Sequence, residues 1–303
     1  MNYTLHQLLI FKTVAHFGSI TKAGESLFLT QPAVSLQLKK FQEQFDYPLI
    51  EIIGKKLYLT DFGGDVLLYA HKILEEAEAI NQITAIRKGE LVGRLKIAIV
   101  STAKYIMPYF LTDFLKKHPQ VELSMDVANK ARVIHSLREN QADFGMVSLL
   151  PEALEVNGIE IMENKLYLVA NSGLAVKSKN AEKIFAEHPI IFREKGSGTR
   201  LTMERFLISQ NITANKSLEL TSNEAVKQAI LAGIGISVMP LIGIKEELKS
   251  GLLKIIDIKG LPISTKWHLI WLKQKEFSPV NKAFIKELEN NKDQIVQRFL
   301  PVI

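Results

Sequence analysis

The sequence contains no cysteine among its 303 residues. Disulfide bonds, thiolate metal ligands and a cysteine nucleophile are therefore excluded, and the composition suits a reducing compartment. Long hydrophobic runs are also missing: the apolar run nearest the start, Leu8 to Phe11, is followed at once by Lys12. A secretory signal needs a longer run, and a membrane-spanning helix needs about 20 apolar residues. We therefore expect a cytoplasmic protein with no membrane partner.

The sequence motifs of common enzymes are missing as well. It has no Gly-x-Ser-x-Gly elbow, no Gly-x-x-x-x-Gly-Lys-[Ser/Thr] phosphate loop and no His-Glu-x-x-His zinc helix. The seven histidines are scattered without the spacing of metal ligands. We therefore expect a protein that is not an enzyme and has neither cofactor nor metal.

The composition that remains is that of an ordinary globular protein, with 47% hydrophobic and 23% charged residues. A chain of 303 residues exceeds the usual span of one hydrophobic core, so two or three domains are expected. The formal charge of +6 favours an anionic partner. That charge alone does not separate nucleic acid from a membrane surface or an acidic ligand.

The first 42 residues have the pattern of three short helices. Apolar residues recur at helical spacing from Leu5 to Phe17, and Gly18 then supplies a stop. Ser19 is a suitable N-cap for a second helix, in which Gly24 costs about 1 kcal/mol relative to alanine. We expect a close contact to require that glycine. Thr30 can cap a third helix, so the segment reads as helix, turn, helix.

The predicted third helix has two different faces, and Pro32 fits its first turn. Its apolar face carries Val34, Leu38, Phe41 and Phe45, and its polar face carries Gln31, Ser35, Lys39 and Gln42. Glutamine near the start of a recognition helix can pair with adenine in the major groove, while serine and lysine can bond phosphates or bases. The polar face therefore predicts DNA contact, and a merely solvated face is the alternative.

Two further elements follow along the chain. After Pro48, β-branched and aromatic residues flank a Gly54-Lys55-Lys56 turn, which predicts a hairpin, or wing. Thr60-Asp61 can then cap a long helix with apolar residues at alternating spacings of four and three, the seam of a coiled coil. These seam residues are Val66, Ala70, Ile73, Ala77 and Ile80. The seam predicts a partner helix.

From Arg94 onward, short apolar strands alternate with helices, which is the order of an α/β domain. A second set of such elements starts around Tyr167, which indicates two lobes. Residues 267–272 and a final helix from about 280 to 299 can return the chain to the first lobe.

The stretch "GSITKAGESLFLTQPAVSLQLKKFQEQFDYPLIEIIGKKLYLTDFG" resembles the DNA-binding domain of LysR-type transcriptional regulators. The resemblance extends over essentially the whole chain. It implies a winged helix-turn-helix domain at 1–60, a dimerising linker helix at 61–89 and an α/β effector domain similar to periplasmic binding proteins at 93–303. Lobe I would comprise about 93–166 and 269–303, and lobe II about 167–268. The implied partners are double-stranded promoter DNA and further copies of the chain, in a homodimer or a dimer-of-dimers homotetramer.

Combined with the helix pattern, the resemblance gives ten candidate DNA-binding residues. They are Ser19, Thr21, Thr30, Gln31, Pro32, Ser35, Gln37, Lys39, Lys55 and Lys56. The wing departs from the family because Ile52 stands where arginine is common and lysines replace arginines. Lysine lacks the bidentate fork of arginine, so we expect more purely electrostatic wing contacts.

Three predicted strand-to-helix junctions carry hydroxyl groups, as anion sites in open α/β sheets do. The candidate effector-binding residues are Ser101, Thr102, Ser148, Ser197, Gly198, Thr199, Arg200, Ser222 and Asn223. Any one of these junctions is more commonly a helix cap, but the three together indicate a ligand site. Lys104, Arg132, Arg193 and Lys195 can add positive charge, although we expect each to be a solvated surface residue.

The segments "FREKGSGTR" and "VELSMDVAN" are similar to the branch of the family that controls carbon-fixation operons, with relatives in sulfur and nitrogen regulation. That resemblance implies a small anionic effector: a phosphorylated sugar, a phosphorylated nucleotide cofactor or a small oxyanion. Two other classes remain open. A solute carrier would use only the lobes, and an enzyme built on the Ser197 loop would need a base and an oxyanion hole that we do not find.

Overall fold

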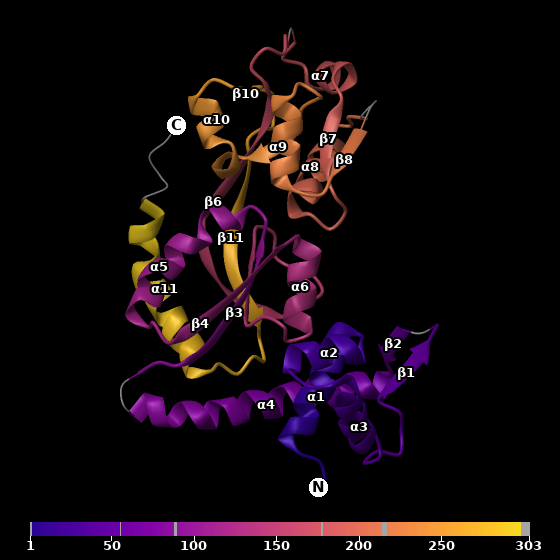
Figure 1. Cartoon of the computed structure of the whole chain (residues 1–303). Helices are drawn as coiled ribbons and strands as arrows, with labels where there is room; N and C mark the ends of the chain where they lie inside the picture. Colours follow the sequence, from indigo (N-terminus) through magenta and orange to yellow (C-terminus); the bar gives the residue numbers. More distant parts are fainter. Residues whose placement is uncertain (1, 55, 88–89, 177, 214–216, 298–303) are drawn as a thin grey trace. The chain divides into compact units, whose positions relative to one another are not determined.

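The computed structural model describes residues 2–54, 56–87, 90–176, 178–213 and 217–297 (Figure 1). The chain divides into two compact units, residues 1–93 and 94–303. We call them the N-terminal unit and the C-terminal unit. Across the ranges given above, no helix is both long enough and apolar enough to cross a membrane.

The N-terminal unit has the predicted order of helix, turn, helix, wing and long helix. Its elements are α1 (Leu5–Phe17), α2 (Ile20–Leu27), α3 (Gln31–Gln42), β1 (Ile50–Ile53), β2 (Lys56–Leu59) and α4 (Asp61–Arg87). The strands of the wing pair antiparallel, with Ile50 opposite Leu59 and Ile53 opposite Lys56.

Local signals fix the ends of the short helices. Gly18 ends α1 in the left-handed conformation, with φ 57°, and the Ser19 hydroxyl accepts a hydrogen bond in the first turn of α2. A Cβ on Gly24 would lie 2.8 Å from the carbonyl oxygen of Leu29, which confirms the close contact expected there. Thr30 precedes α3 as predicted, but its hydroxyl forms no capping bond. The predicted capping bond is therefore wrong: Pro32 at the second helical position has no N–H to donate, and the Thr30 hydroxyl does not accept from the third position either.

The apolar face of α3 forms the centre of the N-terminal core. Val34 and Phe41 are fully buried and Leu38 is 4% exposed. The ring of Phe41 packs against Phe11, at 5.3 Å between centroids, and edge-on against Phe45, at 5.1 Å. The predicted division of α3 into a packing face and an exposed face is therefore confirmed for these positions.

The beginning of α4 belongs to the same core. Val66 packs against it and Ala70 is 1% exposed. Further along the helix, Ile73 is 38% and Ile80 66% exposed. The predicted seam is therefore wrong for its first two residues, which are covered within the unit because α4 packs on α1. Only the later part of the seam is left free for a partner helix.

The C-terminal unit is built on a seven-stranded sheet in the order β10-β6-β11-β5-β3-β4, with β9 paired to β6. The strands are β3 (Gly93–Val100), β4 (Val121–Ala128), β5 (Phe144–Val147), β6 (Val156–Asn171), β9 (Ser237–Pro240), β10 (Leu253–Ile255) and β11 (Ile263–Leu272). A separate pair, β7 (Ile190–Arg193) and β8 (Ser217–Leu220), is parallel.

The two long strands β6 and β11 run through both lobes as an antiparallel pair (Figure 1). At one end β11 pairs with β5, and at the other β6 pairs with β9 and β10. The lobe boundaries expected at 166/167 and 268/269 fall inside these strands. Short apolar runs in the sequence cannot reveal that one strand serves two lobes.

Helices cover the sheet in both lobes. Those of lobe I are η1 (Ala103–Tyr105), α5 (Met107–Lys117), α6 (Lys130–Arg138) and α11 (Pro279–Gln297); those of lobe II are α7 (Ala181–Glu187), α8 (Gly198–Ser209), α9 (Asn223–Leu231), η2 (Leu241–Gly243) and α10 (Lys245–Lys249). In lobe I, Phe114 of α5 packs edge-on against Phe284 of α11. In lobe II, Phe185 and Phe206 belong to one buried cluster. The predicted two-lobed α/β fold is confirmed.

Candidate functional site

The polar face of α3 is the first candidate site. Gln31, Pro32 and Lys39 are exposed, and Ser35 is half-buried beside them. Lys39 lies 4.0 Å from Glu43, and both side chains are more than half exposed. Thr21 on α2 is exposed as well. These side chains are free to reach the edges of bases or the phosphates of a DNA duplex.

Two glutamines of α3 have partners within the unit: Gln42 of the predicted polar face and Gln37 of the predicted DNA-binding set. Gln42 is committed to structure because its amide accepts from Leu49 N, at 2.6 Å, and donates to Tyr47 O, at 3.0 Å. The Gln37 Oε1 atom accepts from Gln7 of α1, at 3.3 Å. Helical spacing alone placed Gln42 on the polar face, and the loop after α3 folds back onto it.

The wing is described in part. Lys55 lies outside the described residues, and for Lys56 only the backbone, in β2, is described. Ile52, which stands where arginine is common in the family, is 70% exposed, and Ile53 is 59% exposed. The wing therefore presents exposed apolar side chains a few residues before its two lysines in the sequence.

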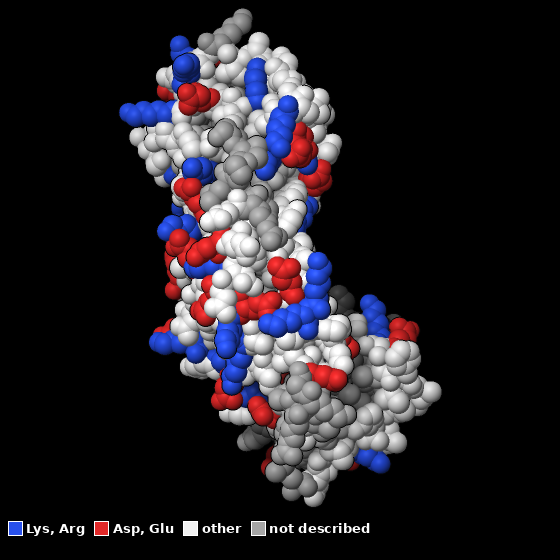
Figure 2. All heavy atoms as spheres, turned by 90° about the vertical axis from the view of Figure 1, so that its left-hand side faces the viewer, with Lys and Arg blue, Asp and Glu red and all other residues white. Residues whose placement is uncertain are grey.

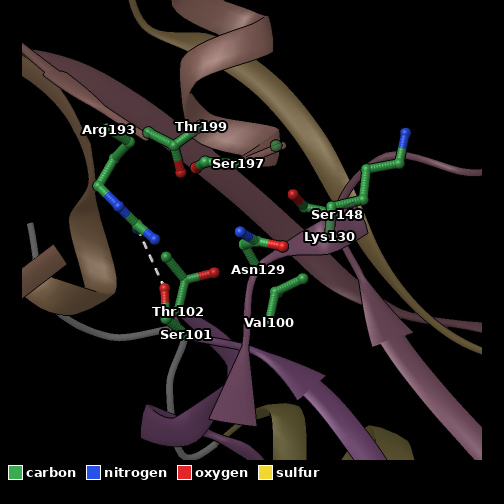
Figure 3. A pocket seen from close by; sticks show the side chains of 10 residues that line it. Val100, Ser101, Thr102, Asn129, Lys130, Ser148, Arg193, Ser197 and Thr199 are labelled. Carbon is green, nitrogen blue, oxygen red and sulfur yellow. Dashed lines mark hydrogen bonds between the residues drawn. The ribbon is translucent and has the colours of Figure 1, made fainter. Parts of the chain in front are cut away.

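The second candidate site is a small pocket between the lobes of the C-terminal unit, with a cavity volume of about 10 Å³ (Figure 3). Val100, Ser101, Thr102, Asn129, Lys130, Ser148, Arg193, Ser197, Gly198 and Thr199 line it. These residues come from the carboxyl ends of β3, β4, β5 and β7 and from the start of α8. Six of the nine predicted effector residues lie together here: Ser101, Thr102, Ser148, Ser197, Gly198 and Thr199.

Several hydroxyl groups in this pocket are unused. In the described part of the chain, the side chains of Thr102, Ser148, Ser197 and Thr199 have no hydrogen-bond partner. Thr102 is 4% and Ser197 5% exposed. Ser197 stands at the N-cap of α8 without making a capping bond. Free hydroxyls at the N-terminus of a twelve-residue helix suit an anionic ligand.

Arg193 is a buried cation in the lining of the pocket, and its predicted place on the surface is wrong. It is 4% exposed because it ends β7 beneath the loop that leads to α8. Its Nε and Nη2 donate to the two carboxylate oxygens of Glu194, at 2.8 and 2.9 Å, and its Nη1 donates to Ser101 Oγ, at 3.0 Å. Figure 3 shows the guanidinium pointing at Ser101.

Hydrogen bonds join the two lobes around the pocket. Ser101 of lobe I accepts from Arg193 and also from Asn223 Nδ2 of lobe II, at 2.8 Å. The backbone N–H of Ala131 in lobe I donates to the carbonyl of Gly196 in lobe II, at 3.1 Å. The structure therefore shows the lobes in contact, with the pocket between them.

Three of the nine predicted effector residues do not line the pocket. Arg200 donates to Glu204, to Glu219 and to the carbonyl of Arg193, so its charge is balanced elsewhere. Ser222 caps α9, accepting from Ala225 N, which is the ordinary role of a serine before a helix. Asn223 does not line the pocket, but its Nδ2 donates a hydrogen bond to Ser101, which does. The predicted helix after Thr102 is first a three-residue 3₁₀ turn, η1.

Four lining residues were absent from the nine predicted effector residues: Val100, Asn129, Lys130 and Arg193, the last of which was expected only to add positive charge from the surface. Asn129 and Lys130 follow β4 and begin α6, so the same strand-to-helix signal could have found them. The ammonium group of Lys130 donates to the carbonyl of Leu150, at 3.1 Å. Burial, followed by the nearby charge of Arg205, lowers the pKa of Lys130, and Glu152 opposes that change.

Charges elsewhere on the C-terminal unit are mixed in sign. On the face in Figure 2, lysines and arginines are interspersed with aspartates and glutamates. The other three cations proposed to add positive charge, Lys104, Arg132 and Lys195, do not line the pocket. Within the described residues, no group of three or more His, Asp or Glu side chains could hold a metal ion.

The fold and the two sites define a winged helix-turn-helix DNA-binding unit joined to a two-lobed ligand-binding unit. The chain matches the bacterial regulatory helix-turn-helix protein of the lysR family over residues 5–64, and the LysR substrate binding domain over residues 88–292. The chain belongs to the LysR family of transcription regulators.

Its relatives include RuBisCO operon regulators. It is 35% identical to the HTH-type transcriptional activator CmpR of Synechocystis over 289 residues, 95% of either chain. It is 37% identical to the RuBisCO operon transcriptional regulator of Acidithiobacillus ferrooxidans, over 94% of this chain and 93% of that one. The resemblance to the carbon-fixation branch is thereby confirmed.

Two solved structures are also similar. The regulatory domain of Synechocystis CcmR, solved in complex with 2-PG, has a TM-score of 0.62 at 33% identity, over 66% of this chain and 97% of that one. Full-length CbnR in complex with its target DNA has a TM-score of 0.63 at 21% identity, over 95% and 99% of the two chains. The second likeness concerns the fold alone.

Proposed function

We propose that this regulator controls promoters in response to a small phosphorylated carboxylic acid, bound in the pocket between its lobes. The observation that carries the proposal is the lining itself: unused hydroxyls of Thr102, Ser148, Ser197 and Thr199 gather around the buried Arg193. A phosphate group offers several strong acceptor oxygens for such donors. The CcmR regulatory domain, solved with 2-phosphoglycolate, supports this class of ligand.

On the DNA side, we propose that α3 enters the major groove. Gln31 would read a base edge, Ser35 and Lys39 would contact bases or phosphates, and Lys55 and Lys56 of the wing would approach the backbone. Ser19, Thr21 and Thr30 remain candidates for phosphate contacts at the helix starts. Gln37 would offer its amide N–H₂ and one further lone pair of its oxygen to DNA, because that oxygen already accepts one hydrogen bond from Gln7.

We further propose that the working form is a homodimer or a dimer of dimers. Ile73 and Ile80 of α4 are exposed at helical spacing, as a surface for a partner helix requires. Two winged units would then bind paired half-sites, and α4 would set their separation. The site is proposed to bind and not to catalyse, with no cofactor or metal, in the cytoplasm where promoter DNA is accessible.

Ligand binding would act through the contacts between the lobes. A ligand alters DNA affinity only if it binds two arrangements of the protein with different affinity, and such couplings are typically about 1–3 kcal/mol. Ser101 occupies a suitable place for this role, because it lies in the pocket and receives two hydrogen bonds from the other lobe.

The test is a titration of the purified protein on its own upstream DNA and on a random duplex, at one fixed salt concentration. Each titration is repeated with 2-phosphoglycolate, glycolate, a sugar phosphate, a phosphorylated nucleotide cofactor and sulfate. We expect tighter binding to the upstream DNA, changed by a phosphorylated acid and unchanged by glycolate. Equal binding to both duplexes with no ligand response would contradict the proposal and favour a carrier of solutes.

A further inference from the structure

Arg193 already has an anionic partner before any ligand is considered. The carboxylate of Glu194 engages the side of the guanidinium, accepting from Nε at 2.8 Å and from Nη2 at 2.9 Å. Arg193 is 4% and Glu194 14% exposed, so solvent screens this pair little. A bidentate pair of this kind is among the stronger hydrogen-bonded contacts in proteins.

The pocket therefore offers less positive charge than its lining suggests. Its described lining contains two cationic residues, Arg193 and Lys130, and no carboxylate. Glu194 neutralises Arg193 from just outside the lining. Lys130 directs its ammonium group to the carbonyl of Leu150, away from the hydroxyls (Figure 3). An entering anion meets hydroxyl dipoles and one cation that is already paired.

Arg193 has hydrogen-bond donors left for a second anion. A guanidinium has five N–H donors, of which Glu194 takes two and Ser101 one. The two remaining N–H groups are on Nη1 and Nη2. An anion held by the free hydroxyls of Thr102 and Thr199 can share Arg193 with Glu194, and the two negative charges then repel each other.

We propose that Glu194 is an internal counter-anion, which stands in for the anionic group of the effector while the pocket is empty and lowers the affinity of the pocket for anions. The inference rests on the proposed function, since it concerns the same pocket. Without Glu194, a closed empty pocket would contain an unpaired buried charge on Arg193. With Glu194, Arg193 can bond Ser101 across the lobes before any ligand arrives.

Glu194 is therefore a positioning residue that sets the effector concentration at which the regulator responds. Its repulsion increases with the charge of the ligand, so it also disfavours highly charged anions relative to singly charged ones. A purely structural role would predict a different result, namely that loss of the carboxylate loosens Arg193 and weakens every ligand.

The chain offers matched controls for this idea. Glu219 is also paired with an arginine near the same loop, but its partner Arg200 does not line the pocket. E219Q removes one negative charge without touching Arg193. E194D retains the charge of residue 194 and shortens the side chain, whereas E194Q retains the size and removes the charge.

The experiment is isothermal titration of the full chain and these three variants with 2-phosphoglycolate and, separately, with inorganic phosphate. We expect E194Q to bind both anions about tenfold more tightly, equivalent to about 1.4 kcal/mol. E194D and E219Q should stay within about threefold of the parent protein, and added salt should reduce the gain in E194Q. Unchanged or weaker binding by E194Q would overturn the proposal, as would an equal gain in E194D.

Thermal unfolding of the same samples separates a loss of stability in a variant from a change in its anion binding. Without anions E194Q should melt below the parent protein, and inorganic phosphate should raise its melting temperature more than that of the parent; a variant that phosphate does not rescue would count against the proposal. If the parent ignores 2-phosphoglycolate while E194Q binds phosphate, the proposed effector class fails and the counter-anion stands. If the parent binds 2-phosphoglycolate and E194Q binds it no more tightly, the proposed effector class stands and the counter-anion fails. Binding by neither protein would overturn both.

Discussion

Replacing Gly63 by alanine tests how α4 is joined to the DNA-binding core. A Cβ at this position would lie 1.9 Å from the carbonyl oxygen of Leu49 and 2.8 Å from its carbonyl carbon. Real Cβ atoms essentially never approach closer than 3.0 Å, so the backbone of Leu49 must move by roughly 1 Å. That backbone leads into the wing, and its carbonyl also accepts from Thr60 N, at 3.2 Å.

The expected loss of stability follows from three contributions. Overpacking a core against backbone typically costs about 1–3 kcal/mol, and the upper end applies because no flexible side chain can yield. Losing the Thr60 hydrogen bond costs about 1 kcal/mol, and the helix preference of alanine over glycine returns about 1 kcal/mol. We therefore expect G63A to destabilise the N-terminal unit by about 3 kcal/mol.

Gly64 provides the matched control, because no atom lies within 4 Å of a Cβ built there. G64A should be neutral or should stabilise α4 by up to about 1 kcal/mol. Hydrogen exchange of α1 to α3 in the full chain measures the effect, with operator affinity as a second readout. Both tryptophans, Trp267 and Trp271, lie in the C-terminal unit, so their fluorescence should not change. Equal hydrogen-exchange protection of α1 to α3 in G63A and G64A would refute the close packing of Gly63 on the backbone of Leu49.

Four further variants test the two sites and the linker. Gln31→Ala should weaken specific binding by about 1–3 kcal/mol and relax discrimination at one base position, measured by titrations on operators with single base changes; uniform weakening on all sequences would show that Gln31 reads no base. Thr102→Val or Thr199→Val should abolish the effector response, with operator affinity in the absence of ligand as the folding control, and an unchanged response curve would remove these hydroxyls from the site. Ile73→Asp should dissociate the oligomer, which light scattering would detect, because it places a charge on the exposed part of the α4 seam; an undisturbed oligomer would contradict that contact.

The elements fixed by local signals could be predicted from the sequence. Gly18 and Pro32 act within a few residues of their own position, so the end of α1 and the start of α3 followed from them. Serine, threonine and glycine after apolar runs located most of the pocket, because β3 and β5 end at one edge of their shared sheet and the junction after β7 meets that edge from the other lobe. Six of the nine predicted effector residues lie at one site for that reason.

The parts that depend on distant contacts could not be predicted. Gln42 has the spacing of the exposed face of α3, yet it bonds the loop that carries Leu49. Val66 and Ala70 have the spacing of a coiled-coil seam, yet α1 covers them. Arg193 reads as a surface charge until Glu194 and Ser101 are seen around it. In each case the deciding partner is set by tertiary structure and not by helical or strand periodicity.

The most direct test of the account is a linkage measurement on the unaltered protein. The dissociation constant of 2-phosphoglycolate is measured with and without saturating upstream DNA, and that of the DNA with and without saturating ligand. Thermodynamic reciprocity requires the two ratios to be equal, and a coupling of about 1–3 kcal/mol predicts a ratio of roughly 5 to 150. Equal ratios clearly different from one would support an effector pocket coupled to promoter binding. Ratios of one, with both partners bound, would contradict it.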